Sequence, residues 1–197
     1  DAPTISTYPY GISKLQGEKA ALQLASPEFS VIVLRQGTVS GYSPRMRLDL
    51  IVNAMFRSAL TGGTITVNNP AIWRPVLGMA DAVQAYLRAV DAAPPTSGVF
   101  NVASGNWTVG DVAATVQREL TDRLGAPVTI DTRHIPDVRN YRVSTARAER
   151  GLGFAPRADI ATIVGDLWEH RGRFADLDSP QYRNIDVFKT VRGMGEG

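Results

Sequence analysis

Apolar positions along the chain follow helical and extended spacings in turn. Leucine and alanine recur among good helix formers over residues 8–25, where Pro9 is tolerated in a first turn, so we predict a helix there. An unbroken apolar run follows at residues 30–34 and is typical of a strand covered on both faces. A helix that leads into such a strand favours an α/β fold.

The rest of the chain repeats this alternation. Apolar residues at helical spacing predict a helix over 48–60, which Gly62 and Gly63 end. Thr108, with Asp111 three residues on, predicts the N-cap of a helix that ends near residue 125. The same patterns predict further helices over 79–90, 145–152 and 159–170, and strands over 64–67, 74–77 and 99–102. We therefore expect a sheet covered by helices.

Several large apolar side chains are predicted to lie in the core. Phe154 and Trp168 occupy apolar positions of their segments. On the predicted helix 79–90, the apolar residues share one side, and Tyr86 among them is interpreted as a core residue. They are Ala82, Val83, Tyr86, Leu87 and Val90.

The composition excludes several classes of protein. The 21 basic and 19 acidic residues are dispersed and form no basic stripe for a nucleic acid. The absence of cysteine excludes disulfides and thiolate zinc sites, and the two histidines are too isolated to predict a metal site. Neither an apolar stretch of roughly 18 residues nor a signal-peptide pattern occurs, so we expect a cytoplasmic protein with no membrane partner.

Tyr10 and Lys14 form the first candidate for chemistry. They are four residues apart on a predicted helix, so both side chains project from one face about one turn apart. An ammonium beside a phenol stabilises the phenolate, which can then take a proton from a sugar hydroxyl. Standing alone, this pair is also compatible with a solvated aromatic–lysine contact.

The residues around this pair resemble the active-site helix of the extended short-chain dehydrogenases/reductases, more specifically of the NAD-dependent nucleotide-sugar epimerases and dehydratases. Pro3, Thr4 and Glu18 belong to the same match. Five further segments resemble this family in the same order along the chain: 34–47, 73–75 with Asp81, 100–106, 137–141 and 152–156. Gly78 departs from the family, which usually has histidine there.

The resemblance implies a Rossmann-like fold that lacks the N-terminal part of its parallel sheet and carries a small C-terminal α/β substrate lobe. Residues 1–47 then form the end of the Rossmann domain, 48–172 mostly the substrate lobe interleaved with returning Rossmann elements, and 173–197 an extended tail, either an arm or a frayed end. The family's Gly-x-x-Gly-x-x-Gly turn does not occur in this sequence. The strand at 30–34 is therefore expected to expose an apolar edge that a partner covers.

The resemblance also implies a cofactor site for NAD, with NADP not excluded. Tyr10 acts as the general base or acid, and Lys14 binds the nicotinamide ribose. The residues after the buried strand are expected to line the cofactor pocket, since ligands gather at the carboxyl ends of strands in α/β sheets. These are Gln36, Gly37, Thr38 and Val39.

A nucleotide-diphosphate sugar is the implied substrate, and its two negative charges suit guanidinium groups. Arg74 and either Arg133 or Arg139 hold the matching positions, with a surface salt bridge as the alternative for each. Asn53 and Thr38 are further substrate candidates, although the Asn53 amide inside an apolar helix is equally compatible with bonds to neighbouring backbone. Asp81 is interpreted as structural.

The favoured function is a nucleotide-sugar 4-epimerase that acts through a transient keto-sugar. A dehydratase or reductase of the same family is the nearest alternative, and a non-catalytic lobe or assembly subunit is the alternative of another class. The expected partner is a second copy of the chain, by analogy with relatives, or a chain that supplies the missing N-terminal half.

Overall fold

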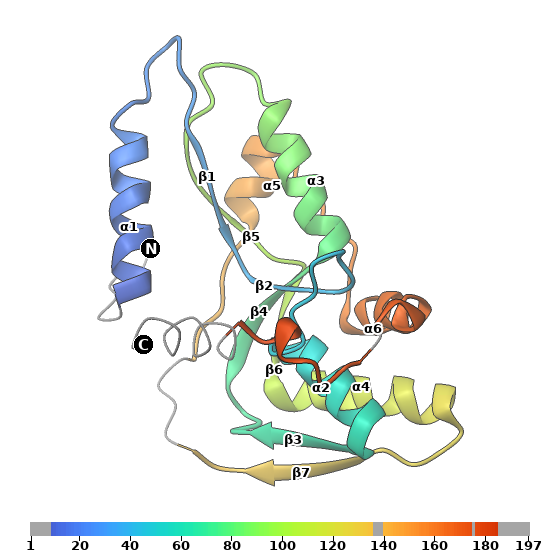
Figure 1. Ribbon diagram of the computed structural model, residues 1–197. Helices are drawn as coiled ribbons and strands as arrows, with labels where there is room; N and C mark the ends of the chain where they lie inside the picture. The colour runs from blue at the N-terminus through green and yellow to red at the C-terminus, as the bar shows by residue number, and fades with distance from the viewer. Residues whose placement is uncertain (1–8, 136–139, 175, 185–197) are drawn as a thin grey trace, which may run out of the picture.

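The computed structural model describes residues 9–135, 140–174 and 176–184. It confirms an α/β fold in which helices and strands alternate along the chain (Figure 1). The first half contains α1 (Pro9–Leu22), β1 (Ile32–Gln36), β2 (Thr38–Ser40), α2 (Ile51–Gly62), β3 (Thr64–Asn68), β4 (Trp73–Gly78) and α3 (Met79–Val90). The second half contains β5 (Gly98–Val102), β6 (Gly105–Thr108), α4 (Val109–Leu124), β7 (Thr129–Arg133), α5 (Ala146–Leu152) and α6 (Ile160–Glu169).

The described strands form three small sheets. β1 pairs with β5 in parallel, and β3 pairs with β7 in parallel. β4 is the centre of the third sheet, with β2 parallel on one side and β6 antiparallel on the other. The short strands β2, β6 and β7 lie outside the predicted strands.

Two hydrophobic clusters hold these layers together. The larger one packs α2, α4 and α6 against β3 and is built around Phe56, Leu120 and Leu167. The smaller one packs α3 and α5 against β5 and includes Phe100 and Phe154, which confirms Phe154 as a core residue. The predicted caps are confirmed as well, since the Asp111 N–H donates to the Thr108 hydroxyl at 3.1 Å and Gly63 ends α2 in the left-handed region.

The structure overturns two predictions of burial. On α3, Ala82 is buried, but Tyr86 is 55% exposed and Val90 is 81% exposed. Strand β1 is half-buried along its length and is not covered on both faces. Both corrections have one cause: among the described residues β1 pairs on one edge only, and the outer side of α3 has nothing packed against it.

The segment after α6 is an arm that packs onto the protein. Phe174, Leu177 and Tyr182 contact the larger cluster, and the Leu48 N–H donates to the Tyr182 carbonyl at 2.8 Å. These contacts concern described residues up to 184, and the assignment of the whole tail 173–197 to an extended arm or a frayed end stays a prediction. In the described part of the chain, helices long and apolar enough for a membrane span do not occur.

Candidate functional site

Tyr10 and Lys14 lie together on the exposed surface of α1. The Lys14 Nζ is 5.6 Å from the centre of the Tyr10 ring, and the Tyr10 side chain is 67% exposed. The geometry therefore confirms the juxtaposition that the four-residue spacing predicts. A phenol and an ammonium held this close can share a proton acceptor or hold one anionic oxygen.

A cavity of about 1110 Å³ opens between α1 and the edge of β1, and we call it the α1–β1 cavity. Tyr10 and Lys14 line it from the helix. Gln36, Gly37, Thr38 and Val39 line the cavity from the strand side. Together with Tyr10 and Lys14, they are all of the predicted cofactor residues. The volume suits a ligand of cofactor size.

Gly37 and Tyr86 shape the far wall of the α1–β1 cavity. A Cβ on Gly37 would lie 3.0 Å from the Pro75 carbonyl oxygen, so any larger residue here would push β4 away by a few tenths of an ångström. Gln36 donates from Nε2 to the Tyr86 hydroxyl at 2.6 Å. Tyr86, which we predicted to be a core residue, therefore lines the cavity.

An ion pair connects α1 to β1 at the same cavity. Arg35 donates to both carboxylate oxygens of Glu18, at 2.8 and 2.5 Å. These hydrogen bonds lower the pKa of the Glu18 carboxyl from its usual value. The pair thus sets the position of the helix on the strand that carries the cofactor residues.

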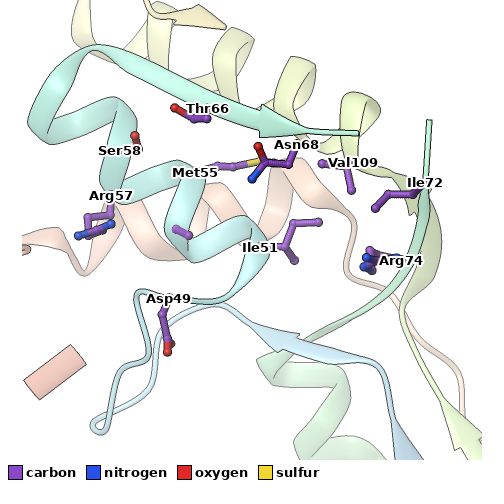
Figure 2. A pocket seen from close by; sticks show the side chains of 11 residues that line it. Asp49, Ile51, Met55, Arg57, Ser58, Thr66, Asn68, Ile72, Arg74 and Val109 are labelled. Carbon is purple, nitrogen blue, oxygen red and sulfur yellow. The ribbon is translucent and has the colours of Figure 1, made fainter. Parts of the chain in front are cut away.

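A second cavity of about 520 Å³ lies between α2, β3 and β4, and we call it the α2–β3 cavity (Figure 2). Arg74 on β4 stands at one end of it. Its walls combine apolar side chains with hydroxyl, amide and charged groups. The other lining residues are Asp49, Ile51, Ala54, Met55, Arg57, Ser58, Thr66, Asn68, Ile72 and Val109.

The chain segment 47–51 separates the two cavities. Arg47 and Leu50 line the α1–β1 cavity, whereas Asp49 and Ile51 line the α2–β3 cavity. Burial tends to raise the pKa of the Asp49 carboxyl, but bonds from Arg47 at 2.9 and 3.0 Å outweigh it and lower that pKa. Asp49 is therefore a fixed anion at the boundary between the cavities.

Two other predicted substrate residues, Asn53 and Arg133, do not line either cavity. The Asn53 amide is buried and bonds to backbone of Gly41 and Arg47, as in the structural alternative for this residue. Arg133, at the end of β7, pairs with Asp131 at 2.8 Å on the surface. Arg139 lies outside the described residues.

Asp81 is structural, as predicted. Its carboxylate accepts the backbone N–H groups of Arg157 and Ala158 at 2.9 Å and the Ser104 hydroxyl at 2.5 Å. Gly78 stands against the same loop, and a Cβ there would lie 2.5 Å from the Ala158 Cβ. The absence of a side chain at Gly78 therefore follows from packing.

Sequence reasoning missed most of the α2–β3 cavity. Ile51, Ala54, Met55 and Ser58 follow helical spacing on α2, and the apolar members of this stripe served only to predict the helix. A serine within such a stripe is the signal that could have marked a polar cavity there. Arg57 and Asp49 carry no comparable signal.

The chain is similar to known enzymes. The model of the NAD dependent epimerase/dehydratase family matches residues 1–103. A UDP-glucose 4-epimerase of Streptomyces lividans is 31% identical over 185 residues, covering 85% of this chain and 55% of that protein. Ketoreductase sphI of Aspergillus fumigatus is 28% identical over 175 residues, covering 85% and 50%.

Solved structures show the same relationship. MoeE5 in complex with UDP-glucuronic acid and NAD has a TM-score of 0.69 at 27% identity, covering 87% of this chain and 58% of that one. TunA, an NAD dependent NDP-hexosamine 5,6-dehydratase, has a TM-score of 0.71 at 25% identity, covering 91% and 58%.

The chain thus spans 50% to 55% of the length of the curated relatives that it matches. The family match over residues 1–103 includes every residue that lines the α1–β1 cavity. With more than half of its residues matched by that model and the fold shared with its solved members, the chain belongs to the NAD dependent epimerase/dehydratase family.

Proposed function

We propose that the chain is the catalytic-helix and substrate-binding part of an NAD(P)-dependent nucleotide-sugar 4-epimerase. The observation that carries the proposal is the Tyr10–Lys14 pair on the wall of one cavity, with Arg74 at the end of the neighbouring cavity. The epimerase relative of Streptomyces lividans supports the choice of reaction.

The residues of the α1–β1 cavity fit the nicotinamide end of the cofactor. Lys14 offers an ammonium for the ribose hydroxyls, and Gln36 to Val39 form a wall at the carboxyl end of β1. A bound nicotinamide would supply one kind of chemistry here, the reversible acceptance of a hydride from a sugar carbon. A glycine-rich cradle for the pyrophosphate belongs to the part of the relatives that this chain does not span.

In the proposed reaction Tyr10 acts first as the general base and then as the general acid. Its phenolate oxygen takes the proton of the sugar 4-hydroxyl while C4 gives up its hydrogen as a hydride, which a bound nicotinamide would accept, and becomes a ketone. The same phenol returns the proton to the oxygen when the ketone is reduced on its other face. Lys14 stabilises the phenolate between these steps, and Arg74 holds the diphosphate so that the sugar can turn.

We also infer that a nucleotide-binding half-sheet covers the open side of this chain. Among the described residues β1 has a free edge, and α3 exposes a stripe beside it. The stripe consists of Val83, Tyr86, Leu87 and Val90, which are between 51% and 81% exposed. Free strand edges and exposed apolar stripes are normally covered, and the relatives are nearly twice as long as this chain.

The function is tested with UDP-glucose and NAD, using this chain together with the nucleotide-binding half of MoeE5 supplied as a separate chain. We expect UDP-galactose, detected by NMR of the anomeric proton. Tyr10→Phe should lower the rate at least 100-fold, since general acid–base catalysis contributes about 10²- to 10⁴-fold. It should leave the affinity for UDP unchanged, because Tyr10 lies outside the α2–β3 cavity.

The product decides between the alternatives. Formation of a 4-keto-6-deoxy sugar would show that the function is that of a dehydratase and not of an epimerase. Net consumption of reduced cofactor would show that it is that of a reductase. Binding of UDP without turnover of any nucleotide sugar would leave the non-catalytic lobe. Tyr42→Phe is a matched control, because its ring stacks on His170 away from both cavities.

A further inference from the structure

The C-terminal arm, residues 171–174 and 176–184, holds one wall of the α2–β3 cavity. The Asn184 N–H donates to the Asp49 carboxylate at 3.3 Å, and Asp178 pairs with Arg57 at 2.9 Å. Asp49 and Arg57 both line the cavity. The arm therefore contacts the ligand-facing wall although its own residues do not line it.

Arg57 is chemically unusual within this wall. Its side chain is 22% exposed, and one terminal nitrogen is engaged by Asp178. Its Nε is buried and has no hydrogen-bond partner in the described part of the chain. A buried donor left unpaired costs free energy, so the hydrogen bonds among the described residues do not by themselves account for the position of this guanidinium.

Arg57 and Arg74 stand at opposite ends of the cavity (Figure 2). Arg74 lies two residues before Val76 on β4, and Val76 pairs with Thr38, which lines the α1–β1 cavity. The Arg74 end of the α2–β3 cavity is therefore next to the α1–β1 cavity, and the Arg57 end is farther from it. Apolar side chains of Ile51, Met55 and Ile72 line the space between the two guanidinium groups.

In the proposed function the sugar lies next to Tyr10 and the diphosphate at Arg74, so the nucleoside extends toward Arg57. We propose that Arg57 donates a hydrogen bond to the acceptor edge of the nucleobase and so determines nucleotide affinity, with Asp178 of the arm as its positioning residue. The inference rests on the proposed function. The ring of a base fits the apolar middle of the cavity, and its carbonyl oxygens accept from a guanidinium.

The experiment is calorimetric titration of the chain with UDP, ADP, GDP and inorganic pyrophosphate. Arg57→Gln should weaken the best-bound nucleoside diphosphate about tenfold, the loss expected for a hydrogen bond from a charged group. It should leave pyrophosphate affinity unchanged, whereas Arg74→Gln should weaken both ligands. Arg118→Gln, on the exposed side of α4, is the matched control and should change neither. Thermal unfolding checks that each variant is folded.

Asp178 is tested in the same titrations. Asp178→Ala should weaken nucleoside diphosphate binding two- to threefold, because an exposed ion pair contributes little by itself. Asp178→Glu should restore the affinity, since it returns the carboxylate that orients Arg57. Neither variant should alter pyrophosphate binding.

The outcomes separate this inference from the proposed function. If Arg57→Gln leaves the affinity for nucleoside diphosphates unchanged, the proposed contact between Arg57 and the base is wrong, but the proposed function still stands. An equal loss for pyrophosphate and nucleoside diphosphate makes Arg57 a phosphate ligand and overturns it too. If the unmodified chain binds none of the four ligands, the substrate site itself is wrong and both proposals fall.

Discussion

The amide of Asn53 uses its hydrogen-bonding capacity inside the protein. Its oxygen accepts from the Gly41 N–H at 3.0 Å, and its nitrogen donates to the Arg47 carbonyl at 3.0 Å. These bonds fasten the loop after β2 to α2, and that loop separates the two cavities. These contacts of the Asn53 amide are therefore explained by a structural role, and they need no ligand.

Asn53→Ala should therefore lower the free energy of unfolding by about 2 kcal/mol, because it leaves buried backbone groups of the loop unpaired. Urea denaturation measures the change. Asn101→Ala, which removes a more exposed amide, is the control and should cost less than about 0.5 kcal/mol. Unchanged stability of Asn53→Ala together with lost UDP binding would instead make Asn53 a substrate residue.

At the scale of an element, α1 depends on an ion pair for its place. The helix has no buried residues among those described, so packing alone does not hold it. The two bonds between Arg35 and Glu18 join it to β1, and the Glu18 side chain is only 12% exposed. Removing this pair should loosen the helix that carries Tyr10 and Lys14.

Glu18→Gln should lower the free energy of unfolding by about 1 kcal/mol at pH 7, near the upper end for partly exposed pairs. Because the bonds from Arg35 lower the pKa of Glu18 in the folded state, this contribution is complete above the unfolded pKa near 4.5. It is lost as the pH falls through the lower, folded pKa.

Urea denaturation of Glu18→Gln and of the unmodified chain between pH 7 and pH 3 measures this difference. Glu119→Gln is the control, since Glu119 pairs with Arg123 on the surface of α4. A stability difference that stays constant over this pH range would show that the carboxylate is not the group holding α1.

At the scale of the whole molecule, the open side of β1 and α3 predicts an assembly. We expect a one-to-one complex with a nucleotide-binding half-domain, such as that of MoeE5, in sedimentation experiments. Replacing Val83 and Leu87 together by serine should weaken the complex at least tenfold, because each exposed apolar side chain contributes about 1 kcal/mol when buried.

Leu124→Ser, at the exposed end of α4, is the control for this assembly and should leave the complex intact. A chain that does not associate with the half-domain contradicts the prediction. Self-association lost in the double variant would assign the surface to a second copy of the chain instead.

Local spacing alone determined several features of this protein. The helix over residues 79–90, the caps at Thr108 and Gly63, and the placement of Lys14 beside Tyr10 follow from neighbours within one or two turns. Such features depend on backbone geometry that four or five adjacent residues settle by themselves. The resemblance to a family rested on the same local motifs.

Only the tertiary structure decided which side of α3 is buried, where the arm lies and what surrounds Arg57. The residues that meet there are far apart in sequence, as Arg57 and Asp178 are, and their contact depends on how helices and strands pack. An apolar stripe such as that of α3 looks the same whether it faces a core or a missing partner. Packing, and not periodicity, tells these two cases apart.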